Sequence, residues 1–264
     1  FCSKKYNKNI IVMLDLLDKY RNDGYVIIDC NQKSIIETIE KKFEKLLQSG
    51  DYNTNAKIYS YNDKPRIVDA YKKIEETVEF SRNKILTDFL KKFYDSDPLP
   101  FSNILFKFGS EQPLHSDYIH HGTYPELLLC GTWTAMENIQ KDSGELVLVP
   151  KSHKFDIFKY SKYGCKKPKS LDEVKKNYNI YEDWVKDLIK KNSLEVKKIY
   201  LKKGETIIWD ANLLHGGASI NKNNQTRKSF VIHYTFKKVN FFYNPTFSFF
   251  KDDQDFSKRT HTFF

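Results

Sequence analysis

The stretch TIIWDANLLHGG, residues 206–217, joins a short β-strand to a loop that ends in a histidine. Residues 206–209 are β-branched or aromatic, and the preceding Gly204 suits a hairpin turn. Two glycines follow His215, and they let backbone and small ligands approach closely because they carry no side chain. We interpret this stretch as a strand that leads into a binding site, and we expect Trp209 to pack in the core.

Similar short strands occur on both sides of this stretch. We predict them at residues 101–108, 127–136, 145–149, 196–201 and 227–236, with turn sequences such as KDSG (141–144) between them. Many short strands separated by turns are typical of a sandwich or barrel. Residues 151–193 interrupt the pattern with a polar, lysine-rich and partly helical stretch. An insertion of this length is often a lid over a site.

The first third of the chain has helical patterning. Apolar residues at helical spacing predict helices at 10–20, 34–47, 69–80 and 85–93, with a short strand at 25–28. The sequence DPLP, residues 97–100, is expected to break the pattern. We therefore predict a single domain over 1–264. Its parts are helical support (1–100), a β core (101–245) with the insertion at about 151–193, and a C-terminal tail (246–264).

His115, Asp117 and His215 form a candidate metal site. On an extended segment the side chains alternate, so His115 and Asp117 point to the same side and can share a metal, with His215 as a third ligand. Two histidines and one carboxylate leave three coordination positions open, which is the arrangement of non-haem Fe(II) oxygenases. Zinc binds the same ligand types, so these residues alone leave the metal open.

Arg227 and Ser229 indicate what else binds at the site. They lie two residues apart on a predicted strand and therefore face the same way, together with His233. A guanidinium holds a carboxylate through two parallel hydrogen bonds, and a serine hydroxyl can add a third. The distal carboxylate of 2-oxoglutarate needs such partners. The pair favours iron with 2-oxoglutarate over zinc.

Four segments carry a resemblance to a known family: GSEQPLHSD (109–117), GTWTAME (131–137), GELVLVPKSHK (144–154) and WDANLLHGG (209–217). In this order and spacing the chain resembles the phytanoyl-CoA dioxygenase family of Fe(II)/2-oxoglutarate oxygenases, clearly over about 101–245 and loosely in the helical part. One departure is Lys151, where the family usually has glycine, and it puts the geometry of that turn in doubt.

The resemblance implies a mainly β fold, a double-stranded β-helix (jelly roll, cupin-like) with an N-terminal helical layer and a lid insertion. It implies His115, Asp117 and His215 as iron ligands. It also implies Arg227, supported by Ser229, as the anchor of 2-oxoglutarate, with Trp133 as a wall of that pocket. Gln112 either reaches the co-substrate or caps its loop.

The implied reaction consumes O2 and 2-oxoglutarate and releases succinate and CO2. Related halogenases replace the carboxylate with a small residue, so the presence of Asp117 favours hydroxylation. The substrates typical of this family favour a small-molecule, lipid-linked or sugar-linked substrate. One alternative is a non-catalytic jelly-roll binding protein, which would lack a ligand or the arginine. Another is an oxygenase acting on protein or nucleic acid, which would favour an open groove and a focused basic patch.

The charge of the chain bears on its partners. The formal net charge is +10 and the isoelectric point is about 9.1. The lysines are scattered and no block of five basic residues occurs, so the sequence predicts no nucleic-acid patch. An anionic small-molecule substrate suits this charge, but the even scatter of the lysines favours a general compositional bias.

The apolar segments and the cysteines bear on location. No apolar run reaches the length of a membrane span, so none is predicted. The cysteines Cys2, Cys30, Cys130 and Cys165 are far apart and form no CxxC motif, which indicates free thiols in a reducing compartment. We therefore expect a cytoplasmic location.

Overall fold

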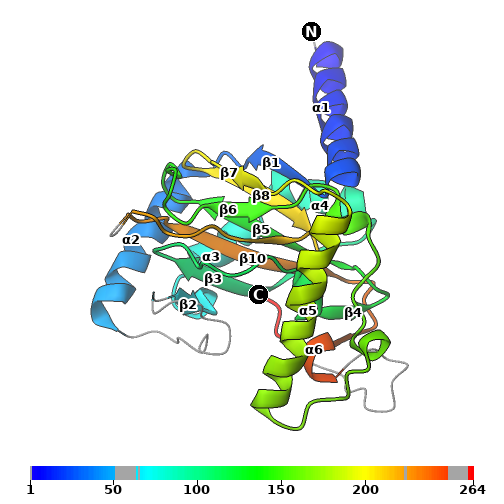
Figure 1. Ribbon diagram of the computed structural model, residues 1–264. Coiled ribbons are helices and arrows are strands. Elements are labelled where there is room, and N and C mark those ends of the chain that lie inside the picture. The colour runs from blue at the N-terminus through cyan, green and yellow to red at the C-terminus, as the bar shows by residue number, and fades with distance from the viewer. Residues whose placement is uncertain (1, 51–63, 65, 223–224, 249–260) are drawn as a thin grey trace.

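The computed structural model describes residues 2–50, 64, 66–222, 225–248 and 261–264 (Figure 1). Its α-helices are α1 (Cys2–Asp23), α2 (Lys33–Ser49), α3 (Glu76–Ser81), α4 (Lys84–Tyr94), α5 (Leu171–Lys191) and α6 (Pro245–Ser248). Its strands are β1 (Tyr25–Asp29), β2 (Arg66–Val68), β3 (Pro98–Phe106), β4 (Gly122–Tyr124), β5 (Leu129–Ala135), β6 (Leu146–Leu148), β7 (Lys197–Ile199), β8 (Glu205–Asp210), β9 (His215–Gly217), β10 (Ser229–Phe236) and β11 (Phe241–Tyr243). Short 3-10 helices lie at Ala70–Lys72, Asp117–Ile119, Ser152–Lys154 and Tyr160–Tyr163.

Two antiparallel sheets form the centre of the molecule. The larger sheet has the strand order β1-β8-β5-β10-β3-β2 and the smaller one has the order β7-β6-β9, while β11 pairs with β4. From β5 to β10 the chain moves back and forth between the two sheets, as in a jelly roll. The predicted fold class, a jelly roll with helices on its N-terminal side, is confirmed.

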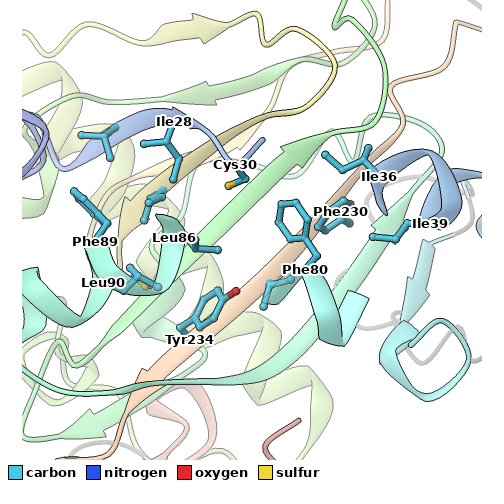
Figure 2. Close-up of a cluster of buried hydrophobic side chains, with 14 of the residues drawn as sticks. Ile28, Cys30, Ile36, Ile39, Phe80, Leu86, Phe89, Leu90, Phe230 and Tyr234 are labelled. Carbon is cyan, nitrogen blue, oxygen red and sulfur yellow. The ribbon is translucent and has the colours of Figure 1, made fainter. Parts of the chain in front are cut away.

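The N-terminal helices cover the outer face of the larger sheet (Figure 2). Alternate residues of β10, namely Phe230, Ile232 and Tyr234, pack on this face against α2 and α4. The other residues of β10 face the smaller sheet, where Val231 belongs to a second core cluster. The period of two along β10 therefore separates a helix-packed face from an inner face that is available for chemistry.

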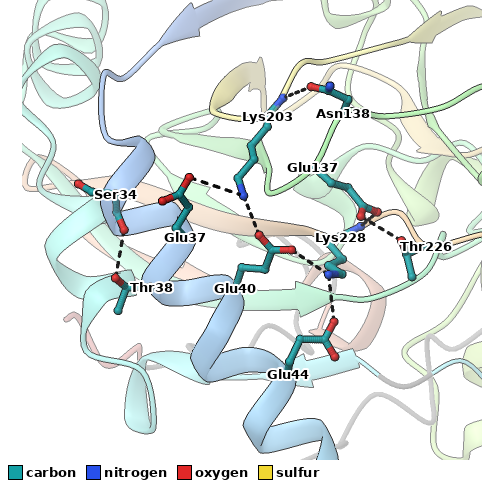
Figure 3. Close-up of polar contacts among 10 residues, drawn as sticks. All are labelled: Ser34, Glu37, Thr38, Glu40, Glu44, Glu137, Asn138, Lys203, Thr226 and Lys228. Carbon is teal, nitrogen blue, oxygen red and sulfur yellow. Dashed lines mark hydrogen bonds and ion pairs between the residues drawn. The ribbon is translucent and has the colours of Figure 1, made fainter.

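Ion pairs fix α2 across the ends of the strands (Figure 3). The Glu40 carboxylate lies 2.8 Å from both Lys203 Nζ and Lys228 Nζ. Glu44 lies 3.2 Å from Lys228 Nζ and 3.0 Å from Lys107 Nζ. Because Lys228 adjoins Arg227 in the sequence, the helical layer is tied to the segment that carries the candidate anchor residue.

Most predicted elements are present with shifted ends. The helix expected at 10–20 extends over α1, and those at 34–47 and 85–93 correspond to α2 and α4. The strands predicted from residue 127 onward are each shorter than expected, apart from β8, which is longer by one residue at each end. Lys151, where a glycine was expected, has a φ of 68°, in the left-handed region that favours glycine. The turn thus keeps its geometry with lysine in place.

One prediction near the start of the β core was wrong. The single helix at 69–80 is two short helical pieces, because the chain leaves the helical conformation at Lys73 (φ −122°) and turns before α3 begins at Glu76. The DPLP stretch breaks the helical pattern as predicted, since α4 ends at Tyr94 just before it, and Pro98 and Pro100 lie within β3. β2 covers β3 only at its far end, so the prolines occupy an edge that needs no backbone donor.

The insertion predicted at 151–193 contains two 3-10 helices and α5. Its residues Phe158, Tyr160, Tyr181 and Val185 form a buried cluster with Ile119 and Leu214, which flank the candidate metal ligands. The insertion thus packs on the site. Of the tail predicted at 246–264, residues 249–260 lie outside the described part of the chain.

No helix among the described residues is both long and apolar enough to cross a membrane. Cys30, Cys130 and Cys165 are free thiols, as expected, while the side chain of Cys2 lies outside the described part.

Replacing Glu40 by glutamine should lower the free energy of unfolding by about 1 kcal/mol at pH 7. Partial burial alone would raise the pKa of Glu40, but Lys203 and Lys228 lower it below its usual value near 4.5. Its stabilisation is therefore present above about pH 4.5 and is lost as the pH falls further. Urea titrations at pH 7 and pH 3.5 measure the difference, with the exposed Asp183→Asn as control. If Glu40→Gln lowered the free energy of unfolding equally at pH 7 and pH 3.5, the ion-pair explanation would be contradicted.

Candidate active site

The backbones of the two candidate histidine ligands are hydrogen-bonded to each other. His115 N donates to His215 O, and His215 N donates to His115 O, both at 2.9 Å. This antiparallel bridge brings the imidazole centroids to 4.6 Å. The loop needs Gly216 beside it, because a Cβ there would lie 2.6 Å from the Gln112 carbonyl oxygen. Residues a hundred positions apart in sequence are thus fixed as neighbours.

Hydrogen bonds also set the tautomer of both imidazoles. His115 Nδ1 lies 2.8 Å from Pro113 O, and His215 Nδ1 lies 2.9 Å from Leu213 O. A carbonyl oxygen only accepts, so each Nδ1 carries a proton and Nε2 is the nitrogen left for a metal. Burial and the imidazoles of His215 and His120 lower the pKa of His115 well below its usual value. A neutral imidazole with a free Nε2 is the form that binds a metal.

Asp117 completes a three-ligand group. One ligand atom from each of His115, Asp117 and His215 lies within 4.8 Å of the others, and all three residues are buried. Asp117 Oδ1 is 3.4 Å from His215 Nε2. Burial would raise the pKa of Asp117, but the His215 and His233 imidazoles hold it well below its usual range. The segment is extended only to Ser116, since Asp117 begins a 3-10 helix, and this turn brings its carboxylate to the histidines.

The second oxygen of Asp117 has partners of its own. Trp209 Nε1 donates to Oδ2 at 2.7 Å, and His233 Nε2 lies 3.4 Å from the same atom. Trp209 is buried as expected, but sequence reasoning missed this hydrogen bond. The glycine at position 131 was a possible sequence signal for the placement of the indole. Gly131 pairs with Trp209, and a Cβ at Gly131 would lie 2.4 Å from the indole ring.

The insertion supports the ligand loop through two tyrosines of α5. The Tyr181 hydroxyl accepts a hydrogen bond from Ser116 N at 2.8 Å, between the two ligands of that loop. The Tyr178 hydroxyl lies 3.4 Å from His120 Nε2, and the two rings are stacked. These contacts were not predicted, because nothing in the sequence of the insertion specifies them.

Arg227 forms a separate part of the site. Only 3% of it is exposed, and its guanidinium carbon lies 5.2 Å from the Trp133 ring and 5.5 Å from the Phe106 ring. No carboxylate of the described residues forms an ion pair with it. One weak hydrogen bond, from Nη2 to Phe108 O at 3.4 Å, is present, and Nε has no partner among the described residues. Burial lowers its pKa to about 10, so it stays charged at pH 7.

The other predicted site residues lie around these two groups. Trp133 is buried beside Arg227, and its Nε1 has no partner among the described residues. The Ser229 hydroxyl donates to the Arg227 carbonyl oxygen at 3.3 Å. Gln112 places its amide nitrogen 3.1 Å from His115 Nε2, the atom that faces the candidate metal position. The structure thus gathers Gln112 with the histidines, and Trp133 and Ser229 with the arginine.

A protein-family model described as phytanoyl-CoA dioxygenase (PhyH) matches residues 20–229. The chain belongs to this family. The resemblance identified from the four sequence segments is therefore confirmed, and with it the predicted enzyme class, a dioxygenase.

Curated relatives carry the same name. The chain is 25% identical over 239 residues to a probable phytanoyl-CoA dioxygenase of Caenorhabditis elegans, covering 81% of this chain and 72% of the relative. It is 25% identical over 245 residues to the peroxisomal phytanoyl-CoA dioxygenase of Mus musculus, covering 86% and 69%.

Solved structures share the fold at lower identity. The non-heme alpha ketoglutarate dependent epimerase SnoN from nogalamycin biosynthesis matches with a TM-score of 0.64 and 13% identity, covering 87% of this chain and 84% of that one. EctD from S. alaskensis with bound Fe matches with a TM-score of 0.63 and 16% identity, covering 83% and 75%. The names of these two neighbours include alpha ketoglutarate and bound Fe, respectively.

Metal binding should stabilise the fold through the three-ligand group. With Co(II) at a hundred times its dissociation constant, the wild type should gain about 2.7 kcal/mol and unfold at a higher temperature. Asp117→Ala should lose most of this gain, because the group loses its carboxylate. Anaerobic thermal denaturation with and without Co(II) measures both. An equal gain in wild type and variant would show that Co(II) binds elsewhere.

Proposed function

We propose that this protein is an Fe(II)- and 2-oxoglutarate-dependent dioxygenase that hydroxylates a small-molecule substrate. His115, Asp117 and His215 would hold the iron on one face, and Arg227 would hold the distal carboxylate of 2-oxoglutarate. The observation that carries the proposal is the buried, charged Arg227, which has no carboxylate of the described residues within ion-pair distance, although the more distant Glu145 and Glu137 favour its charged form. A charge in that position is costly unless an anion binds it.

When bound, the iron with 2-oxoglutarate and O2 would supply the oxidant, with succinate and CO2 as co-products. The residues of the chain bind, orient and exclude water. Arg227 would take the distal carboxylate in a bidentate manner, because its guanidinium edge lacks acidic partners and its faces are covered by Trp133 and Phe106. Ser229 would add a hydroxyl beside it. Gln112 would contact the co-substrate at the iron, since its amide adjoins His115 Nε2.

The substrate would contact a wall of aromatic rings next to Asp117. His233 is 6% exposed and its Nδ1 has no hydrogen-bond partner among the described residues. The His121 ring lies 5.4 Å from that of His233, and Phe101 and His261 continue the wall at 4.4–6.1 Å. Imidazole donors beside an apolar ring suit a small molecule with a carboxylate, phosphate or hydroxyl group. This supports an anionic substrate, whether free, lipid-linked or sugar-linked.

The predicted alternatives are less well supported. A non-catalytic binding protein has no need for a complete ligand group, and this chain has all three residues and the arginine. An oxygenase acting on protein or nucleic acid would call for a focused basic patch, whereas Lys203, Lys228 and Lys107 are paired with glutamates of α2.

A single domain over 1–264 and a cytoplasmic location stay predictions, and the mouse relative is named as peroxisomal.

The proposal is tested by succinate formation from 2-oxoglutarate. Purified protein with Fe(II) should form succinate only when O2 is present, and screened anionic small molecules should raise the rate. His115→Ala and Asp117→Ala should abolish it. Succinate formation that survives in both variants would overturn the proposed function.

Arg227→Met should weaken 2-oxoglutarate binding by roughly tenfold to a hundredfold, the loss expected for a charged hydrogen-bonded pair. Metal affinity should not change, since Arg227 contacts none of the three ligands. Titration of the anaerobic Co(II) protein with 2-oxoglutarate measures the effect, with the exposed Arg82→Met as the matched control. Unchanged 2-oxoglutarate affinity in Arg227→Met would exclude it as the anchor.

A further inference from the structure

We propose that Trp209 is a positioning residue that restricts Asp117 to binding the metal through Oδ1 alone. The inference rests on the proposed function and assigns a role to a residue outside the ligand group. Trp209 Nε1 donates to Asp117 Oδ2 at 2.7 Å, while Oδ1 is the oxygen that faces His215 Nε2. The two carboxylate oxygens are therefore differentiated before any metal binds.

The indole of Trp209 can interact with Asp117 in one way only, by donating a hydrogen bond to Oδ2. Trp Nε1 is only a donor, so it binds an oxygen whose lone pairs are available and never competes as a metal ligand. The bond is short, 2.7 Å between Nε1 and Oδ2, and both groups are buried. Rotation of the carboxylate toward bidentate metal binding would turn Oδ2 away from the indole and leave a buried N–H group unsatisfied.

The position of the indole is itself fixed. Trp209 is 2% exposed and pairs with Tyr25 on one side and Gly131 on the other. Its ring lies against Gly131, where no side chain fits, and 4.5 Å from the His215 ring. One side chain thus contacts two of the three candidate ligands, and its strand neighbours leave it no room to turn.

The restriction matters for the number of open positions at the metal. Three single-atom ligands would leave three positions at the metal for the co-substrate and O2. A bidentate Asp117 would occupy one of them. By holding Oδ2, Trp209 would keep that position open.

His233 is the other group near Oδ2, but it cannot replace the indole. Its Nε2 lies 3.4 Å from that oxygen, longer than a charge-assisted hydrogen bond. In a neutral imidazole only one of the two ring nitrogens carries a proton, so His233 Nε2 can donate in one tautomer and not in the other. The indole N–H always donates. Loss of the indole N–H should therefore have an effect that His233 does not mask.

Trp209→Phe tests the inference because it keeps a ring against Gly131 and His215 and removes only the donor. In the anaerobic full-length protein, we expect Co(II) affinity to fall about tenfold, as for other groups that orient a ligand. The visible absorption of the Co(II) protein should change in intensity, because the spectrum depends on coordination number. Trp184→Phe, which removes an indole N–H from α5, should leave affinity and spectrum at their wild-type values.

A second measurement uses the unsubstituted residue and stands if Trp209→Phe fails to fold. With ¹⁵N-labelled tryptophan and Zn(II) bound, the indole N–H resonance assigned to Trp209 should exchange slowly with solvent. That resonance should lose its protection in Asp117→Ala. A wild-type spectrum and affinity in Trp209→Phe, or an indole signal indifferent to Asp117→Ala, would overturn the inference alone. Co(II) binding that is unaffected by Asp117→Ala would overturn both the inference and the proposed function.

Discussion

The two backbone hydrogen bonds between His115 and His215 are the contact on which the site depends. His115 lies in the loop that follows β3 of the larger sheet, and His215 begins β9 of the smaller sheet. The bridge therefore exists only when the two sheets have closed on each other. Closure sets the separation of the imidazoles, and the upstream carbonyl oxygens then set their tautomers. Formation of the metal site and completion of the jelly roll are in this sense one event.

The second constraint is the buried charge of Arg227. Its neighbours in sequence anchor it from outside, since the Glu137 carboxylate accepts hydrogen bonds from Thr226 Oγ1 at 3.0 Å and from Lys228 N at 2.8 Å. Lys228 extends the other way to Glu40 and Glu44 of α2. The segment thus sends Lys228 outward to acidic partners and Arg227 inward, where no carboxylate of the described residues lies within ion-pair distance. The helical layer, which contributes no candidate ligand of its own, thereby holds the segment that carries Arg227.

Much of this arrangement could be predicted from sequence. Strand periodicity gave the inner and outer faces of β10, and ligand chemistry pointed to the three buried residues that the structure brings together. The failures were of two kinds. The turn that divides the helix predicted at 69–80, and the start of β3 at Pro98 rather than residue 101, depend on contacts between strands that local patterns do not encode. The Trp209–Asp117 and Tyr181–Ser116 hydrogen bonds join residues 92 and 65 positions apart, and each residue alone has an ordinary packing explanation.

These missed contacts show how the ligand loop gains its rigidity. The loop from His115 to Asp117 is short and irregular, so its own hydrogen bonds do not fix it. It is held instead from three directions: β9 binds the backbone of His115, α5 binds the backbone of Ser116, and β8 binds the side chain of Asp117. Each support uses a donor or acceptor that does not face the metal position. The atoms that do face it are therefore fixed in direction without being used by these three supports, which is what an open, three-ligand centre requires.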